Sequence, residues 1–293
     1  MIQRLLLLAL ACLAQVGIAE EAFTRAEAIY GRKFGTALTL DVIQPKNANG
    51  YGVCAMISGG FFSSHEGINP GYMKELLDRG YTVFAVVHGS QPRFTIPEIY
   101  SDIHRAVRFV RANAVKYQVK PERLAVFGAS AGGNLSLTLG TQGKPGDPSA
   151  KDPVDRESSA VQAVACFFPP TDFMNWGEPG DEQVGIGRVG RQFYPAFGSQ
   201  SDKPETRAAL GRQISPIHFV TRSMPPTLIV HGDSDRLVPI YQAEIFQKKA
   251  QDAGATCELV RKEGADHGWP NMEKDIARFA DWFDKHLRGI QKN

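Results

Sequence analysis

LAVFGASAGG, residues 124–133, is the stretch of this sequence that decides the fold. Its first four residues are apolar, as expected of a short strand buried on both faces. A helical pattern follows over residues 131–139, so the chain must turn sharply at Ser130. Gly128 and Gly132 stand two residues before and after that serine, where the backbone comes too close to itself for larger side chains. The pattern therefore predicts a strand that turns into a helix, with Ser130 at the exposed turn.

Strands and helices alternate on both sides of this stretch. Short apolar or alternating runs predict further strands over residues 35–45, 53–57, 82–87, 161–168, 227–231 and 256–262. Periodic apolar positions predict helices over residues 70–79, 97–115, 239–253 and 272–287. Residues 140–159 are expected to form a surface loop, and residues 174–214 a small, partly helical insertion. Together these units predict an α/β fold with a mostly parallel central sheet and helices on both faces.

Residues 1–19 are expected to be a signal peptide rather than part of this fold. Arg4 supplies a positive charge, and the apolar stretch Leu5 to Leu13 is too short to span a bilayer as a helix. Small residues three and one positions before Glu20 fit a cleavage site there. We therefore expect a single domain over residues 20–293, exported to the periplasm or secreted, with no stable membrane insertion after removal of the signal.

The charge of the chain argues against a nucleic-acid partner, and its cysteines bear on burial, disulfides and metal binding. The formal net charge is +2, from 33 basic and 31 acidic residues, with no run of Lys and Arg. Nucleic acid is therefore not an expected partner.

Cys54, Cys166 and Cys257 lie in apolar or β-rich runs, which predicts buried strand residues. One disulfide with an odd thiol left over is the alternative. No two of them are close enough in sequence to suggest a metal site.

A serine hydroxyl becomes a useful nucleophile only when a base takes its proton. His267 lies in a polar turn between the last strand and the last helix, at the sheet edge where sites of open α/β folds gather. An acid that holds this imidazole would come from the preceding strand end, where both Asp233 and Asp235 are available. Along the chain the serine comes first, then the acid and then the histidine. This order is typical of proteins whose nucleophilic serine lies at a turn between a strand and a helix.

Paired glycines follow the strand of residues 53–57, in Ser58-Gly-Gly-Phe-Phe62. Such a turn can direct backbone N–H groups toward a bound carbonyl oxygen, as an oxyanion hole requires. Aromatic residues of the insertion, together with Phe61, Phe62 and Trp269, either wall a substrate pocket or cover the core. Phe62 and Trp269 are the candidate pocket residues.

The chain resembles the α/β-hydrolase superfamily, and within it bacterial esterases related to acetylxylan and feruloyl esterases and to the hormone-sensitive-lipase group. The resemblance rests on the glycine turns at 58–62 and 128–133, and on further segments at 102–110, 170–172, 232–239 and 266–268. It implies that Asp235 is the acid of a Ser130–Asp235–His267 triad. It also implies that the oxyanion donors are the backbone N–H groups of Gly60, Phe61 and Ala131.

Two departures from that family's pattern stand out. The family often has histidine where this chain has Ser58, and a tyrosine–arginine step where this chain has His88-Gly-Ser. Neither removes a triad residue, but together they leave the subfamily open.

The chemistry expected from these residues is hydrolysis of an ester through an acyl-enzyme, with no metal and no organic cofactor. The expected substrate is a small-molecule or carbohydrate-linked acyl ester. Two alternatives remain at this stage: a serine peptidase of the prolyl-oligopeptidase kind, and a non-catalytic binding protein on the same scaffold.

Overall fold

The computed structural model describes residues 22–290, so the expected signal peptide lies outside the described residues. Its centre is an eight-stranded sheet in the order β1-β2-β4-β3-β5-β6-β7-β8. The strands are β1 (Phe23–Lys33), β2 (Thr36–Pro45), β3 (Gly52–Met56), β4 (Thr82–Val87), β5 (Leu124–Ala129), β6 (Ala163–Phe167), β7 (Thr227–Gly232) and β8 (Cys257–Lys262). The six strands from β4 to β8 in this order are parallel, whereas β2 pairs antiparallel with both β1 and β4. The predicted mostly parallel α/β fold is thus confirmed.

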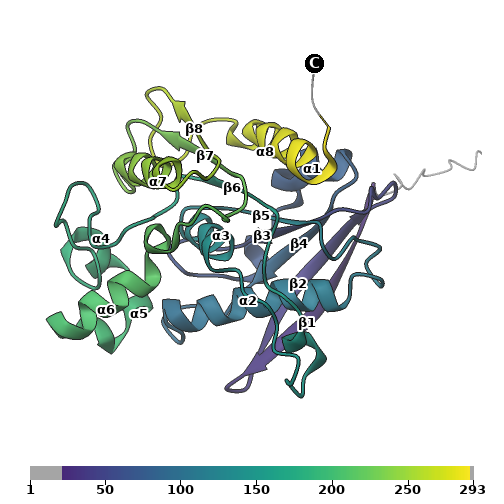
Figure 1. Ribbon diagram of the computed structural model, residues 1–293, viewed down its shortest axis with the longest axis horizontal. Helices are drawn as coiled ribbons and strands as arrows, with labels where there is room; N and C mark the ends of the chain where they lie inside the picture. Colours follow the sequence, from purple (N-terminus) through teal and green to yellow (C-terminus); the bar gives the residue numbers. More distant parts are fainter. Residues whose placement is uncertain (1–21, 291–293) are drawn as a thin grey trace, which may run out of the picture.

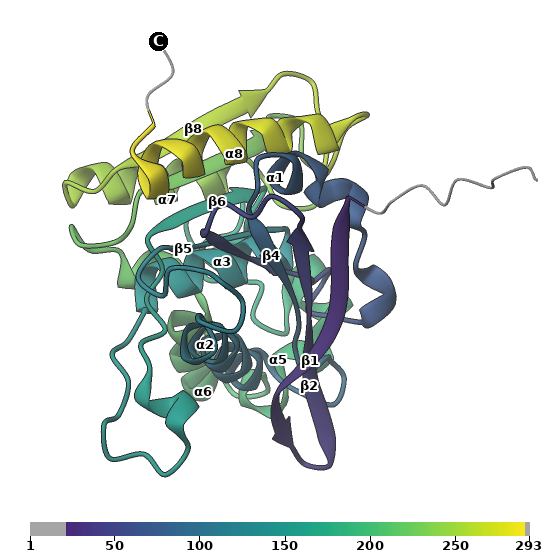
Figure 2. The same ribbon diagram turned by 90° about the vertical axis from the view of Figure 1, so that its right-hand side faces the viewer.

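Helices cover both faces of the sheet (Figures 1 and 2). They are α1 (Lys74–Asp78), α2 (Ile96–Ala112), α3 (Ala131–Gln142), α4 (Gly187–Gln192), α5 (Tyr194–Phe197), α6 (Pro204–Ile214), α7 (Tyr241–Asp252) and α8 (Ile276–Phe283). Apolar residues of α2, α3 and α7 pack on one face, which we call the α2–α3 core. Those of α1 and α8 pack on the other face, the α1–α8 core. Within residues 22–290, no helix has the length and apolar character needed to cross a membrane.

The N-terminal strand β1 was not predicted. Most of its side chains are exposed or half-buried, because it is an edge strand that pairs only with β2. Backbone hydrogen bonds to β2 hold this strand in place, and such bonds leave little apolar pattern in a sequence.

Two predicted helices are shorter than expected. The segments over 70–79 and 272–287 begin as 3₁₀ turns at Pro70–Met73 and Met272–Asp275 before α1 and α8.

The segment between β6 and β7 forms the predicted insertion and carries α4, α5 and α6 (Figure 1). Three aromatic side chains within residues 173–197 are buried, whereas Tyr194 is exposed. Trp176 and Phe197 are buried in the α2–α3 core, and Phe173 packs between them with ring centroids 5.5 Å and 5.6 Å away. The insertion therefore covers the carboxyl ends of the central strands, where it forms part of the site described below.

Cys54, Cys166 and Cys257 are buried and unpaired within the described residues. They lie on β3, β6 and β8, in agreement with the expectation of buried strand residues. Burial raises the pKa of the Cys54 and Cys257 thiols to about 12. The alternative prediction of one disulfide among these three cysteines is therefore wrong.

The α1–α8 core gives a direct test of the packing. Phe279 on α8 is fully buried, and its ring packs at a tilt against Phe167 of β6 with centroids 4.4 Å apart. Phe279→Ala would leave a cavity there, so we expect a loss of about 3–5 kcal/mol in the free energy of unfolding, measured by urea denaturation. The control Val115→Ala changes a side chain that is 94% exposed, and should shift stability by less than about 0.5 kcal/mol. Equal effects of the two changes would contradict this packing.

Candidate active site

Ser130 occupies the turn between β5 and α3 with a positive backbone φ of 54°. Few residues with a side chain adopt this conformation, and where they do a functional site is a common reason. The two flanking glycines make the turn possible. A Cβ on Gly128 would lie 2.4 Å from the carbonyl oxygen of Gly132, and a Cβ on Gly132 would lie 2.5 Å from that of Met56. The spacing of the two glycines therefore follows from backbone contacts.

The structure brings Ser130, His267 and Asp235 together from three separate strand ends. His267 Nδ1 lies 2.7 Å from Asp235 Oδ2, and its Nε2 lies 3.0 Å from Ser130 Oγ. The carboxylate can only accept, so Nδ1 carries the proton. Nε2 is then free to accept the hydrogen bond of the Ser130 hydroxyl. This is the tautomer in which an imidazole can remove a proton from serine.

Asp235 is buried, and its second oxygen, Oδ1, accepts hydrogen bonds from the backbone N–H groups of Leu237 and Val238, each at 2.9 Å. A second imidazole faces the same carboxylate, because Nε2 of the fully buried His231 lies 3.4 Å from Oδ2. Burial alone would raise the pKa of Asp235. The hydrogen bonds from His231, His267 and the backbone outweigh burial and hold that pKa well below its usual value, so the group is a carboxylate at neutral pH.

Asp233 has a different place. Its carboxylate accepts a hydrogen bond from the backbone N–H of Gly264 at 2.8 Å. In the same pair of loops, Asp266 accepts from the backbone N–H of Arg236 at 2.9 Å and forms an ion pair with its guanidinium. These contacts hold the loop that carries Asp235 against the loop that carries His267.

The glycine turn after β3 lies beside Ser130. Gly60 and Phe61 both have positive φ, 53° and 64°. Both line the same small pocket as Ser130 and Ala131. Among the described residues, none accepts a hydrogen bond from the backbone N–H of Gly60, Phe61 or Ala131. These three N–H groups are therefore open to a ligand.

The two departures from the family's pattern turn out to contact each other. His88, which follows β4, is buried, and its Nε2 lies 2.8 Å from Ser58 Oγ. Its Nδ1 lies 2.8 Å from the carbonyl oxygen of Gly89, which can only accept. Nδ1 therefore carries the proton, and the Ser58 hydroxyl donates to Nε2. A histidine from β4 thus holds the first residue of the glycine turn.

The segment after β4 holds the rest of this turn as well. Gln91 donates from its side chain to the carbonyl oxygen of Gly60, and from its backbone N–H to that of Phe61. Asp102 on α2 anchors the segment from behind, because it accepts from the backbone N–H of Gly89 at 2.9 Å and from Lys33 Nζ at 2.7 Å. The glycine turn is therefore fixed by contacts that reach the outer strand β1.

The pocket at Ser130 is small and apolar, with a free volume of about 20 Å³. Its walls are aromatic and aliphatic side chains of the turn, the insertion and the Asp235 loop: Phe61, Phe173, Trp176, Val189, Phe193, Phe197, Leu237 and Val238. The aromatics of the insertion thus wall a pocket and cover the core at once.

The two candidate pocket residues lie elsewhere. Phe62 is 52% exposed and lines a second, larger cavity on the other side of the glycine turn. Trp269 is not among the residues that line either cavity. Its indole N–H donates to Asp275 at 2.8 Å, and its ring packs edge-on against Phe168. Phe168 in turn lies against the His267 ring, with centroids 4.3 Å apart. Trp269 therefore supports His267 from behind.

Sequence reasoning missed four residues at this site: His88, Gln91, Phe168 and His231. His231 lies near the end of β7, and its spacing of four residues from Asp235 brings the two side chains together across the loop. His88 was noticed only as a departure. A buried polar residue at the carboxyl end of a parallel strand was the available signal for both histidines.

The central sheet, the strained serine turn and the Ser–His–Asp cluster define an α/β-hydrolase. The BD-FAE family model matches residues 40–250, which is most of the chain, and the protein belongs to that family.

Named esterases are among its relatives. Esterase LipQ of Mycobacterium tuberculosis is 28% identical over 62% of this chain and 41% of its own length. The acetylxylan esterase of Xylanibacter ruminicola is 24% identical over 84% of this chain and 45% of its own length. The chain thus spans less than half of each of these relatives. A carbohydrate esterase from gut microbiota has the same fold, with a TM-score of 0.71, 23% identity, and coverage of 92% of this chain and 99% of the other.

His88 generates a prediction on pH. Burial, opposed by the hydrogen bond to Gly89 and helped by nearby Lys33, lowers the pKa of His88 to about 4. In the unfolded chain a histidine has a pKa near 6.5, so between about pH 6.5 and 4 only the unfolded state is protonated there. Stability supported by neutral His88 is therefore complete above that range and falls as the pH drops. We expect the melting temperature of His88→Gln to fall less over this range than that of the wild type.

Val115→Ala supplies the control, because it changes an exposed side chain that carries no titratable group. This variant should keep the wild-type slope of melting temperature against pH. A His88→Gln slope as steep as the wild-type slope would contradict the assignment of a buried neutral imidazole at position 88.

Proposed function

We propose that this protein is a serine carboxylic-ester hydrolase that acts through an acyl-enzyme on small or carbohydrate-linked acyl esters. The observation that carries the proposal is the position of His267 between Ser130 Oγ and Asp235 Oδ2, at 3.0 Å and 2.7 Å. Membership of the BD-FAE family and the named esterases among its relatives support the same class of reaction.

In the proposed first step, His267 Nε2 takes the proton of Ser130 as Oγ attacks the ester carbonyl carbon. Asp235 holds the ring and stabilises the imidazolium that forms. His267 then gives this proton to the alcohol oxygen as the carbon–oxygen bond breaks, which leaves an acyl group on Ser130. A water molecule, activated by the same imidazole, releases the acid.

The charge on the carbonyl oxygen in both steps needs donors that are already in place. The backbone N–H groups of Gly60, Phe61 and Ala131 are proposed for this role, because they line the Ser130 pocket and have no other partner among the described residues. The N-terminus of α3, which begins at Ala131, adds a favourable dipole.

The size of the Ser130 pocket favours a short acyl group. Its free volume of about 20 Å³ is little more than a single water molecule requires. The pocket is lined by rigid aromatic rings, and the Phe193 ring would be 2.4 Å from a Cβ on Gly60. We therefore place acetyl and similar small acyl groups ahead of long chains.

Three substitutions test the roles of these residues, with hydrolysis of 4-nitrophenyl acetate as the assay. Ser130→Ala should lower kcat by about 10⁵–10⁶-fold, because the nucleophile is lost. Asp235→Asn should lower kcat by about 10³–10⁴-fold, because an amide cannot hold His267 in the required tautomer. Asp233→Asn is the matched control. Its amide oxygen can still accept from Gly264, so kcat should stay within about threefold of the wild type.

Four results would contradict the proposal or one of its residue assignments. Full activity in a folded Ser130→Ala would exclude the serine mechanism. A larger loss in Asp233→Asn than in Asp235→Asn would move the acid to the other aspartate. A wild type that is inert on every ester but cleaves peptide 4-nitroanilides would favour the peptidase alternative, and inertness on both would favour a binding protein.

We also propose that the protein is exported and that residues 1–19 are removed. The charge at Arg4 and the short apolar stretch after it support this. Expression of the full chain in a bacterial host should give a mature protein that begins at Glu20, as measured by intact mass and N-terminal sequencing. A protein that retains Met1 in the cytoplasmic fraction would contradict export.

A further inference from the structure

Gln242 is a fully buried polar residue at the start of α7, and the proposed mechanism gives it no role. Its side-chain oxygen accepts hydrogen bonds from the backbone N–H groups of Thr171 and Asp172, at 2.8 Å and 2.7 Å. Its side-chain nitrogen donates to the backbone carbonyl oxygens of Asn175 and Trp176, at 2.8 Å and 2.7 Å. One amide thus binds the main chain of a short segment at four points, an arrangement that we call the Gln242 clamp.

The amide of glutamine matches this segment because it carries two N–H donors and an oxygen with two lone pairs. The clamp uses all four, since each partner is a main-chain group that can only donate or only accept. The same four partners also fix which end of the amide is oxygen and which is nitrogen. A glutamate of the same length lacks the two donors, and a methionine offers at most a weak acceptor.

The segment held by the clamp has no regular structure of its own. Residues 168–186, which the structure describes throughout, form neither helix nor strand between β6 and α4. Thr171 and Asp172 are buried within this stretch. Buried main-chain groups without a helix or sheet partner need another one, because leaving them unpaired is costly. The clamp therefore supplies hydrogen bonds that secondary structure supplies elsewhere in the fold.

Phe173 and Trp176 of this segment are walls of the Ser130 pocket. Their rings stack with centroids 5.5 Å apart, and Phe173 also packs on Phe61 of the glycine turn at 6.3 Å. The indole N–H of Trp176 donates to the carbonyl oxygen of Leu237, in the loop after β7, at 3.1 Å. This wall is carried by the same main chain that the clamp holds, so the clamp decides where the wall stands.

Gln242 itself does not line the Ser130 pocket. Among the described residues, its hydrogen bonds go to the segment of residues 171–176 and, from its own backbone N–H, to Pro239 rather than to the triad. Loss of the clamp should therefore leave the catalytic groups in place and change the shape of the wall. The freed main-chain groups would have to move away from α7 to reach water, and Phe173 and Trp176 would move with them.

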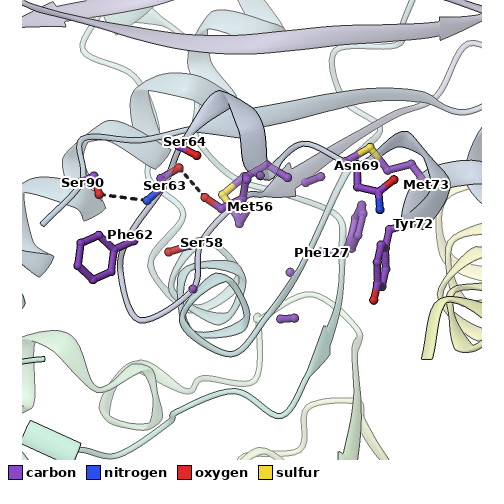
Figure 3. A pocket seen from close by; sticks show the side chains of 16 residues that line it. Met56, Ser58, Phe62, Ser63, Ser64, Asn69, Tyr72, Met73, Ser90 and Phe127 are labelled. Atoms are coloured by element: carbon purple, nitrogen blue, oxygen red, sulfur yellow. Dashed lines mark hydrogen bonds between the residues drawn. The ribbon is translucent and has the colours of Figure 1, made fainter. Parts of the chain in front are cut away.

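The larger cavity on the other side of the glycine turn provides a comparison. Figure 3 shows this cavity, with Phe62 at one side and Tyr72 and Phe127 at the other. The residues that line it include none from the segment of residues 171–176. A substitution in this lining should therefore leave unchanged any selectivity that arises in the Ser130 pocket.

We propose that Gln242 is a positioning residue that sets the acyl-chain preference of the enzyme. The clamp holds Phe173 and Trp176 where they close the Ser130 pocket behind a short acyl group. The inference rests on the proposed esterase function and adds to it the residue that fixes the size of the acyl site. Longer acyl chains should enter once the clamp is broken, although no residue that touches the ester has changed.

The test compares kcat/KM for 4-nitrophenyl acetate and 4-nitrophenyl hexanoate, which differ only in the acyl chain. Gln242→Met removes the hydrogen bonds of the clamp at nearly constant side-chain length. It should raise the ratio of hexanoate to acetate hydrolysis by about tenfold, the order that one or two methylene groups contribute in an apolar pocket.

Two controls accompany this variant. Gln247→Met makes the same change on the same helix, in a side chain that contacts the carbonyl oxygen of Cys257 on β8 instead of the clamped segment. Tyr72→Ala alters the lining of the larger cavity. Both should leave the hexanoate-to-acetate ratio of the wild type unchanged.

Gln242→Glu gives a second measurement that a merely structural role would not produce. It keeps the acceptor side of the clamp but places a carboxylate oxygen against the carbonyl oxygens of Asn175 and Trp176. Protonation of that oxygen restores one donor, so the hexanoate-to-acetate ratio of this variant should fall toward the wild-type value between about pH 8 and about pH 5. Protonation of His267 affects both esters alike and cancels in the ratio.

An unchanged ratio in a folded Gln242→Met, or equal losses on both esters, would overturn the role of Gln242 and leave the esterase proposal standing. A shift as large in Tyr72→Ala would also overturn it, by placing the acyl chain in the larger cavity. If circular dichroism shows that Gln242→Met does not fold, a ratio independent of pH in Gln242→Glu would overturn it in the same way. A wild type that hydrolyses neither ester would overturn the esterase proposal and this inference with it.

Discussion

The close approach of three backbone segments at Gly132 is the constraint on which the site depends. Gly132 faces the carbonyl oxygen of Met56 at the end of β3, and its own N–H donates to the carbonyl oxygen of Ser58 at 3.2 Å. Helix α3 is thereby pressed against the strand that leads into the glycine turn. Because no side chain intervenes, the position of Ser130 relative to residues 58–62 is set by backbone geometry, which is stiffer than contacts between side chains.

The other side chains of the site lie on two pairs of loops, and hydrogen bonds between the loops of each pair hold them in position. The loops after β7 and β8 share the contacts of Asp233 with Gly264 and of Asp266 with Arg236, and the loops after β3 and β4 share those of His88 and Gln91. None of these residues lines the Ser130 pocket. Their effect is to convert four exposed loops into two rigid units, so that the donors and the imidazole are already oriented when an ester arrives.

Much of this arrangement could be predicted from the sequence, and the reasons differ from residue to residue. The turn at Ser130 was predictable because a local steric rule dictates the glycines around it, and the parallel strands because buried strands are continuously apolar. The contact between Ser58 and His88 was not, since it joins positions thirty residues apart whose meeting depends on β3 and β4 being neighbours in the sheet. Trp269 was misplaced for a related reason, because an aromatic residue next to a site histidine can face the ligand or the core, and only the packing of Phe168 decides between them.

The three buried thiols of β3, β6 and β8 have a consequence for how this molecule meets its surroundings. Cys54, Cys166 and Cys257 are unpaired, so no cross-link between them holds these three strands together. Buried thiols with a raised pKa react slowly with alkylating agents unless the sheet opens around them, and Cys54, Cys166 and Cys257 are 0%, 0% and 6% exposed. Each of β3, β6 and β8 thus carries one thiol whose alkylation reports local opening of the sheet. The relative alkylation rates of the three thiols would show whether the sheet opens strand by strand from β8 or all at once.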